Sequence, residues 1–408
     1  MDIKVKDFEI STKKIIGWGT GKCFQVNFEK YNFDFAYIID SNESRHGESV
    51  LGFDIKSPAI LNEENPEDVI IIIYSSFFDE IQKQIVKLGP FITINIYDFI
   101  EREVFSYSME EREAKAKAFW DEKRTYKGVD MNHWESNDWI NQIIAERAYG
   151  SNHANWIDYI SDLYLPGKTG LKVLSLGCGT GLLERKIARQ LDCELIKAVD
   201  FSELSIQEAR NLAELENLSF LIEYEVENLN TIILPTQAYD LIVAEESIHH
   251  VENLEHLYTQ VQKALKPDGL FIQNEFTGPD RFQWTDEQLE EINKILDTLA
   301  PQYKIKDSYE RPRLVDMLAN DPSEAVRSSE IIPLTYSYFE VIDRREMGGN
   351  IMHLLYQCLN VEYFNENADR YCRYLLNSIL EYEKKIFLEE GKSDTAFLVS
   401  KLHKDSNH

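Results

Sequence analysis

The stretch VLSLGCGTGLLERKIARQL, residues 173–191, constrains the fold more strongly than any other part of this chain. Its glycines Gly177, Gly179 and Gly181 stand at alternate positions between an apolar run and a segment with helical spacing. A strand that turns sharply into a helix favours residues without a Cβ, which also let a ligand approach the backbone closely. Asp200 ends the next apolar run, 23 residues after Gly177, where a carboxylate can bind both hydroxyls of a ribose. The pattern therefore predicts a nucleotide-binding βα unit.

Apolar runs that alternate with helical segments predict an α/β domain over residues 166–408. Seven strands are expected, over residues 171–176, 194–200, 220–226, 239–244, 269–276, 338–347 and 394–403. A long helical insert over residues 351–387 is expected between the last two strands.

The spacing of the glycines indicates which cofactor the loop suits. A dinucleotide-binding loop of the form G-x-G-x-x-G needs a glycine at position 182, where this chain has Leu182. The G-x-G-x-G form is followed by AVDFSELSIQEAR, YDLIVAEESIHHVENL and ALKPDGLFIQNEF, and together they resemble the class I S-adenosylmethionine (SAM)-dependent methyltransferases over residues 165–405. The resemblance implies a seven-stranded Rossmann-like sheet, with S-adenosyl-L-methionine as the cofactor.

The same resemblance implies which residues contact that cofactor. The three glycines border its methionine part, Asp200 binds its ribose and Phe201 lies beside its adenine. Asn228 matches the position that reads the adenine amine. Ser175 stands where the family commonly has an acid, so its contact to the amino group is expected to be weak or water-mediated. The full set implied for the cofactor is Ser175, Gly177, Gly179, Gly181, Asp200, Phe201, Asn228 and Glu245.

Residues after the fourth and fifth strands of this domain are candidates for catalysis, because ligands bind beyond the carboxyl ends of such strands. Methyl transfer needs an aligned acceptor nucleophile and, for a hydroxyl, removal of its proton. A neutral histidine near pH 7 suits the second task. The candidates are His250, His249, Glu246 and Glu275. The alternative is that the histidines cap or pack the next helix and the acids are solvated or ion-paired.

The segment GPDRFQW is a candidate for binding the acceptor. Phe282 and Trp284 can form a platform for a sugar face or an aromatic ring, and Arg281 can pair with an anionic group. The alternative is a loop anchored by buried aromatic side chains. The polar stretch at residues 309–333 is either a substrate lid or a solvated loop.

A second glycine loop, IIGWGTGKCF at residues 15–24, occurs near the N-terminus, and Asp40 again follows its first glycine by 23 residues. Residues 1–104 alternate strands and helices, and residues 12–100 resemble small Rossmann-like domains attached to bacterial glycan- and sugar-modifying enzymes. That resemblance implies a possible nucleotide-sugar site. Its contacts are expected from Gly17, Gly19, Gly21, Lys22 and Asp40. The alternative is a scaffold domain that no longer binds a ligand. Residues 105–165 are expected to be a helical linker or cap.

Composition excludes several classes of partner. The net charge of −28 opposes binding to nucleic acid, which depends on neutralising phosphates with Lys and Arg. No apolar stretch has the roughly 20 residues that span a bilayer, so we expect no membrane partner. The five cysteines are scattered, without metal-ligand spacing, which predicts reduced thiols, no metal and a cytoplasmic location. The oligomeric state is not predicted.

These observations predict a SAM-dependent methyltransferase that acts on a small molecule, with a sugar, nucleotide-sugar or natural-product precursor favoured. O-methylation is expected ahead of N-methylation. One alternative is a sugar-nucleotide enzyme whose second domain only senses SAM. Another is a non-catalytic nucleotide- or SAM-binding scaffold protein of a glycan-assembly complex.

Overall fold

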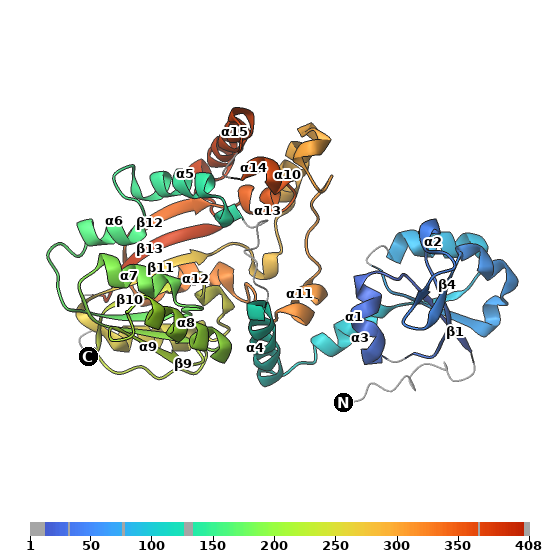
Figure 1. Cartoon of the computed structure of the whole chain (residues 1–408), viewed down its shortest axis with the longest axis horizontal. Helices are drawn as coiled ribbons and strands as arrows, with labels where there is room; N and C mark the ends of the chain where they lie inside the picture. The colour runs from blue at the N-terminus through green and yellow to red at the C-terminus, as the bar shows by residue number, and fades with distance from the viewer. Residues whose placement is uncertain (1–12, 32, 76–77, 126–133, 366–367, 404–408) are drawn as a thin grey trace. The chain divides into compact units, whose positions relative to one another are not determined.

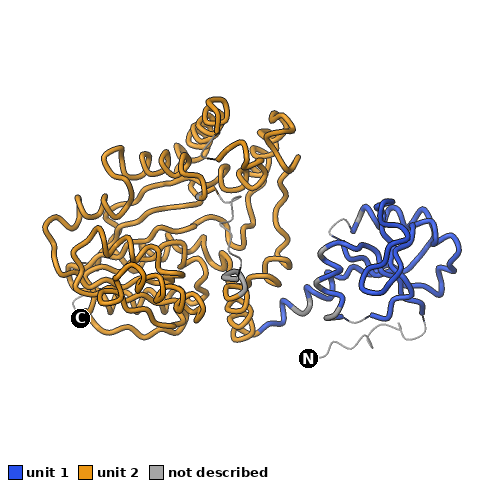
Figure 2. Tube along the Cα trace, viewed as in Figure 1, with its two compact units in different colours: residues 1–107 blue, residues 108–408 orange. Residues whose placement is uncertain are grey.

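The computed structural model describes residues 13–31, 33–75, 78–125, 134–365 and 368–403. The chain divides into two compact units, residues 1–107 and residues 108–408 (Figure 2). The helices expected between the two domains belong almost entirely to the second unit. Among the residues that the structure describes, no helix is both long enough and apolar enough to cross a membrane.

The described part of unit 1 forms a six-stranded sheet with the strand order β3-β4-β2-β1-β5-β6. Its strands are β1 (Lys14–Trp18), β2 (Phe35–Ile39), β3 (Ser49–Val50), β4 (Phe53–Lys56), β5 (Val69–Ile73) and β6 (Ile92–Asn95). Its helices are α1 (Lys22–Tyr31), α2 (Phe78–Leu88) and α3 (Ile96–Val104). Every residue of β5 is buried, as its unbroken apolar run predicts.

Two features of unit 1 differ from the expected pattern. The apolar stretch FITINIYDF at residues 91–99, whose pattern predicts one strand, does not stay extended: β6 ends at Asn95, whose side chain accepts a hydrogen bond from the Tyr97 N–H as α3 begins. The hairpin of β3 and β4 was not expected. Leu51 and Gly52 connect its strands with φ values of 49° and 87°. Positive φ at both residues of a two-residue turn is typical of a tight hairpin.

Unit 2 contains a seven-stranded sheet in the order β12-β13-β11-β10-β7-β8-β9. Its strands are β7 (Leu171–Leu176), β8 (Cys193–Asp200), β9 (Ile222–Val226), β10 (Tyr239–Glu245), β11 (Leu265–Phe276), β12 (Glu340–Gly348) and β13 (Thr395–Lys401). Strands β7 to β11 pair in parallel, whereas β13 pairs antiparallel with both β11 and β12. All seven expected strands form, and the predicted fold class is confirmed.

Helices cover both faces of this sheet (Figure 1). Because alternate residues of a strand point to opposite faces, Val173 and Leu174 of β7 belong to different cores. One core packs α5 (Asp138–Tyr149), α6 (Trp156–Leu163), α7 (Leu182–Gln190) and α8 (Glu203–Leu215) against the sheet. The other packs α9 (Leu254–Ala264) and α12 (Ile331–Tyr338) against the opposite face.

A third apolar core of unit 2 lies among helices at the β12 and β13 side of the sheet (Figure 1). The insert expected over residues 351–387 is three helices, α13 (Met352–Tyr356), α14 (Val361–Phe364) and α15 (Arg370–Ile386). They pack with α5 and with α10 (Asp286–Thr298). The remaining helices are α4 (Met109–Thr125), which contacts α8, and α11 (Leu314–Asn320), which contacts α4.

Candidate active site

The glycine loop after β7 adopts a backbone that other residues rarely adopt. Gly177, Gly179 and Gly181 have φ values of 71°, 52° and 75°. A Cβ on Gly177 would collide with Ser247, and a Cβ on Gly181 would collide with the Tyr224 hydroxyl. The positive φ values favour glycine at all three positions, and close neighbours leave no room for a Cβ at Gly177 and Gly181.

Asp200, at the end of β8, holds this loop in place. Its Oδ2 accepts a hydrogen bond of 2.9 Å from the Gly179 N–H, and its Oδ1 accepts one of 2.9 Å from the Ser202 N–H. An ionised carboxylate has about four acceptor positions, so it can accept several hydrogen bonds at once. The Ser202 hydroxyl in turn donates to Asp121 of α4 over 2.6 Å, which joins α4 to the site.

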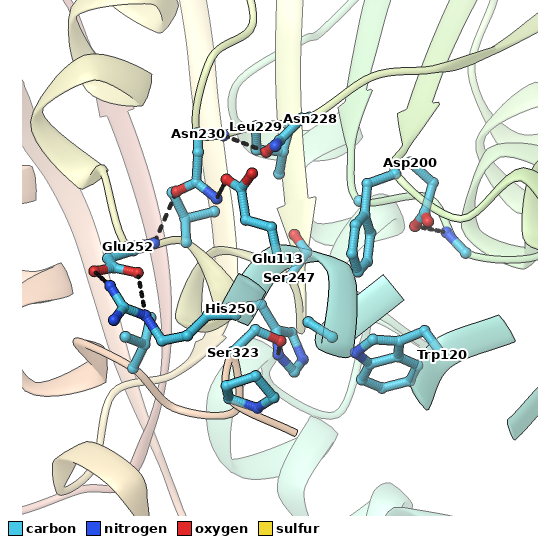
Figure 3. Close-up of a pocket in the computed structure, with 18 of the residues that line it drawn as sticks. Glu113, Trp120, Asp200, Asn228, Leu229, Asn230, Ser247, His250, Glu252 and Ser323 are labelled. Carbon is cyan, nitrogen blue, oxygen red and sulfur yellow. Dashed lines mark hydrogen bonds and ion pairs between the residues drawn. The ribbon is translucent and has the colours of Figure 1, made fainter. Parts of the chain in front are cut away.

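A pocket opens at the carboxyl ends of β7, β8, β9 and β10, where the strand order changes direction between β7 and β10 (Figure 3). Ligands of open α/β sheets bind at such a position. Its walls come from the glycine loop, the loops after β8, β9 and β10, helix α4 and the turn at residues 322–326. The implied cofactor residues that line it are Gly177, Gly179, Asp200, Phe201 and Asn228.

Three residues implied for the cofactor do not line this pocket. Gly181 begins α7, and Ser175 is buried beneath the loop, where its hydroxyl donates to the carboxylate of Glu184. Burial raises the pKa of Glu184 to about 7, although the Ser175 hydrogen bond opposes that shift. Glu245 accepts hydrogen bonds of 3.0 Å from the Trp156 indole and 3.1 Å from the Asn274 amide.

His250 and Glu246 are the catalytic candidates that line the pocket. The His250 ring meets the Trp120 ring edge-to-face, with centroids 5.1 Å apart, and its Nδ1 lies 3.2 Å from the Ser323 hydroxyl. Figure 3 shows these three side chains beside one another. Glu246 has a φ of 49°, a conformation that costs energy outside glycine.

His249 and Glu275 lie behind the pocket wall. The His249 Nδ1 is 2.9 Å from Glu275 Oε2, and Glu275 is completely buried. Glu275 also accepts hydrogen bonds from the Ser247 N–H over 2.9 Å and the Ile248 N–H over 2.8 Å. Burial alone lowers the pKa of His249, but the hydrogen bond and charge of Glu275 outweigh it and raise that pKa above its usual value. Glu275 therefore positions the turn and its histidine.

The three acceptor candidates Arg281, Phe282 and Trp284 do not line the pocket. Trp284 is buried in the core of the helical insert, and the Phe282 ring stacks on it with centroids 5.1 Å apart. The Arg281 guanidinium donates to the carbonyl oxygens of Pro322 and, over 3.1 Å, Glu324. Their positions match the alternative interpretation of this segment, a loop anchored by buried aromatic side chains.

Helix α4 contributes a wall that the sequence analysis did not single out. Four of its residues line the pocket, namely Arg112, Glu113, Ala116 and Trp120. Arg112 forms a 2.7 Å ion pair with Glu252, which follows β10. Glu113 accepts a 3.2 Å hydrogen bond from Asn230, which follows β9 (Figure 3). Trp120 is an aromatic residue in a strongly charged segment, and this was the sequence feature that could have indicated that α4 lines a pocket.

The glycine loop of unit 1 repeats part of this geometry. Asp40 accepts hydrogen bonds of 3.0 Å from the Thr20 N–H and 2.9 Å from the Asn42 N–H. Gly19 has a φ of 104°, and a Cβ there would press against the Tyr74 carbonyl. A Cβ on Gly17 would meet Ile38, whereas Gly21 faces open space. The Lys22 side chain lies outside what the structure describes. Nucleotide-sugar binding by unit 1 stays a prediction.

The sheet and its pocket have the Rossmann-like arrangement in which ligands bind beyond the carboxyl ends of the strands. A family model described as a methyltransferase domain matches residues 167–323. The sequence predicts a methyltransferase domain, and residues 167–323 match one.

Proteins similar to the chain carry related names. It is 30% identical to a sterol 24-C-methyltransferase of Candida albicans over 122 residues, which are 30% of this chain and 32% of that protein. It is 26% identical to malonyl-[acyl-carrier protein] O-methyltransferase 2 of Ilyobacter polytropus, over 34% of this chain and 59% of that protein. The chain spans about a third of the length of the sterol methyltransferases that it matches.

Solved structures resemble it at low identity. A SAM-dependent methyltransferase from Mesorhizobium loti shares 19% identity, with a TM-score of 0.36, over 60% of this chain and 97% of that one. The [4+2]-cyclase SpnF shares 16% identity, with a TM-score of 0.37, over 64% of this chain and 92% of that one.

Proposed function

We propose that the whole chain is a methyltransferase that transfers a methyl group from SAM to a small molecule in the pocket of unit 2. The observation that carries this proposal is the placement of Asp200 beside the glycine loop, with both groups facing one pocket. The cofactor supplies the methyl group and the sulfonium leaving group. Asp200 binds the ribose, Phe201 covers the adenine and the glycine loop admits the methionine part.

The acceptor shares this pocket with the cofactor. Apolar side chains, including those of Ala116, Trp120, Val251 and Val326, line much of the pocket. Such a wall fits a small acceptor with an apolar face, such as a natural-product precursor or the flat face of a sugar. The named relatives include a carbon and an oxygen methyltransferase.

O-methylation is the reaction that we favour, because a proton acceptor faces the pocket. His250 and Glu246 both line it after β10, and either can take the proton of an acceptor hydroxyl. In-line transfer also requires the acceptor to be held against the methyl group, which the α4 wall provides.

The proposal is tested with SAM carrying a tritiated methyl group, offered with a panel of sugars, nucleotide-sugars and aromatic hydroxyl compounds. Asp200→Asn should weaken SAM binding at least tenfold, because a hydrogen bond to a charged group contributes roughly 1.5–3 kcal/mol and each 1.4 kcal/mol is a factor of ten. The matched control is Asp192→Asn, an exposed aspartate just before β8.

Calorimetry on the two variants separates the outcomes. Unchanged SAM affinity in Asp200→Asn would show that the site is assigned wrongly. SAM binding without transfer to any acceptor would support the scaffold alternative instead.

A further inference from the structure

Two histidines and a glutamate converge beside the pocket. His249 and His250 follow β10, and Glu324 lies in the turn after α11. One ligand atom from each lies within 4.8 Å of the others. His249 Nε2 and Glu324 Oε1 are 3.6 Å apart, which is too long for a hydrogen bond. Two ligands held at 2.0–2.1 Å from a tetrahedral ion lie roughly 3.3 Å apart, so the separation suits a bound ion.

The histidine closest to Glu324 already has the support that metal ligands need. His249 Nδ1 lies 2.9 Å from Glu275, which is buried and fixed by two backbone N–H groups. Histidines that bind metals commonly donate their other ring N–H to a carboxylate, which fixes the tautomer and directs the remaining nitrogen. In the neutral tautomer with the proton on Nδ1, the Nε2 lone pair of His249 is available on the side of Glu324.

The charge around the histidines supplies a second, independent observation. Asp321 is 4% exposed, and its Oδ2 has no hydrogen-bond partner within the part of the chain that the structure describes. Glu275 and Glu324 add two further carboxylates beside His249, and the guanidinium groups of Arg281 and Arg112 are nearby cations. Buried carboxylates are costly without compensating charge, and a divalent cation would supply more of it.

Hydrogen bonds to the backbone hold the segments that carry His249 and Glu324 together. The Val326 N–H donates to the His249 carbonyl over 3.0 Å, and the Arg281 N–H donates to the Ala325 carbonyl over 2.7 Å. The Arg281 guanidinium also donates to the Glu324 carbonyl. Rigid support of this kind keeps ligand atoms at coordinating distance.

We propose that His249, His250 and Glu324 bind a divalent transition-metal ion, with Zn²⁺ best suited to two imidazoles and a carboxylate. His250 also lines the pocket, so the ion belongs to the pocket wall (Figure 3). On the proposed function, an acceptor oxygen would meet the ion there. His250 is then a ligand, and Glu246 is left to accept the proton.

The test uses the full chain, stripped with a chelator and titrated with Zn²⁺ or Co²⁺ alone. We expect one ion per chain by elemental analysis, visible ligand-field bands with Co²⁺ and a higher melting temperature with metal. Glu324→Gln should weaken metal binding at least tenfold. The matched control Glu330→Gln, an exposed glutamate paired with Arg327 nearby, should bind as the wild type does.

Two results would overturn the site: no uptake of metal by the wild type, or equal affinity in the Glu324 and Glu330 variants. SAM titration of the same metal-free samples separates this proposal from the proposed function. Metal binding without SAM binding would refute the proposed function and support the metal site. SAM binding without metal uptake would refute the metal site and leave the proposed function standing.

Discussion

Glu184, a single buried residue of α7, links the glycine loop to the interior of unit 2. Its carboxylate accepts a hydrogen bond from the hydroxyl of Ser175, near the end of β7, and its other oxygen has no hydrogen-bond partner among the residues that the structure describes. Full burial favours the neutral, protonated form of a carboxyl group. The pKa of about 7 for Glu184 therefore makes the stability of the domain depend on pH.

The direction of this dependence follows from proton binding. The folded protein binds this proton more tightly than the unfolded chain, whose ordinary pKa is 4.5. The stabilisation is complete below that value and is lost as the pH rises toward about 7. We expect urea unfolding to show that the wild type loses about 2 kcal/mol more than Glu184→Gln between pH 5 and pH 7.5. Equal losses in the two proteins would contradict the prediction.

Individual residues also show where sequence analysis reached its limit. The positions of Gly177 and Asp200 at the loop were predictable, because a tight turn between a strand and a helix favours glycine and the acid follows it at a fixed spacing. The position of Glu324 was not, because it follows His250 by 74 residues and only the folded turn brings them together. Spacing in sequence therefore predicted no metal ligands.

At the scale of elements, the strands were easier to predict than the helices that close the pocket. The central strands β7 and β10 are buried on both faces, so their apolar runs predict them directly. Helix α4 is mostly charged, and its role depends on partners such as Ser202 and Glu252 in distant loops. A local pattern cannot reveal such partners.

The place of α4 in the pocket leads to a test by substitution. Ala116 is buried and lines the pocket, whereas Ala118 on the same helix is exposed. Ala116→Trp should fill the space next to the cofactor site and weaken SAM binding at least tenfold, because overpacking displaces neighbouring groups. Ala118→Trp should bind SAM within twofold of the wild type by calorimetry. If both variants bound SAM with similar affinity, α4 would not be part of the cofactor site.

At the scale of the whole molecule, each unit has its own sheet and its own apolar core. All residues that line the pocket lie between positions 112 and 326, within unit 2. We therefore expect a chain of residues 108–408 to fold and to bind SAM within about twofold of the full protein, measured by calorimetry. A loss of tenfold or more in a folded fragment would show that unit 1 contributes to cofactor binding.

The hydrogen bonds from Thr20 to Asp40 and from Gly179 to Asp200 have a consequence for how such sequences are compared. In each unit the aspartate accepts hydrogen bonds from backbone N–H groups of the glycine loop and of the segment after its own strand. It therefore has a structural role even when no ligand is bound. Selection for folding alone can preserve the aspartate and the glycine loop after a domain has lost its ligand. Genome surveys that count glycine turns followed by an acid will therefore overestimate the number of working nucleotide sites.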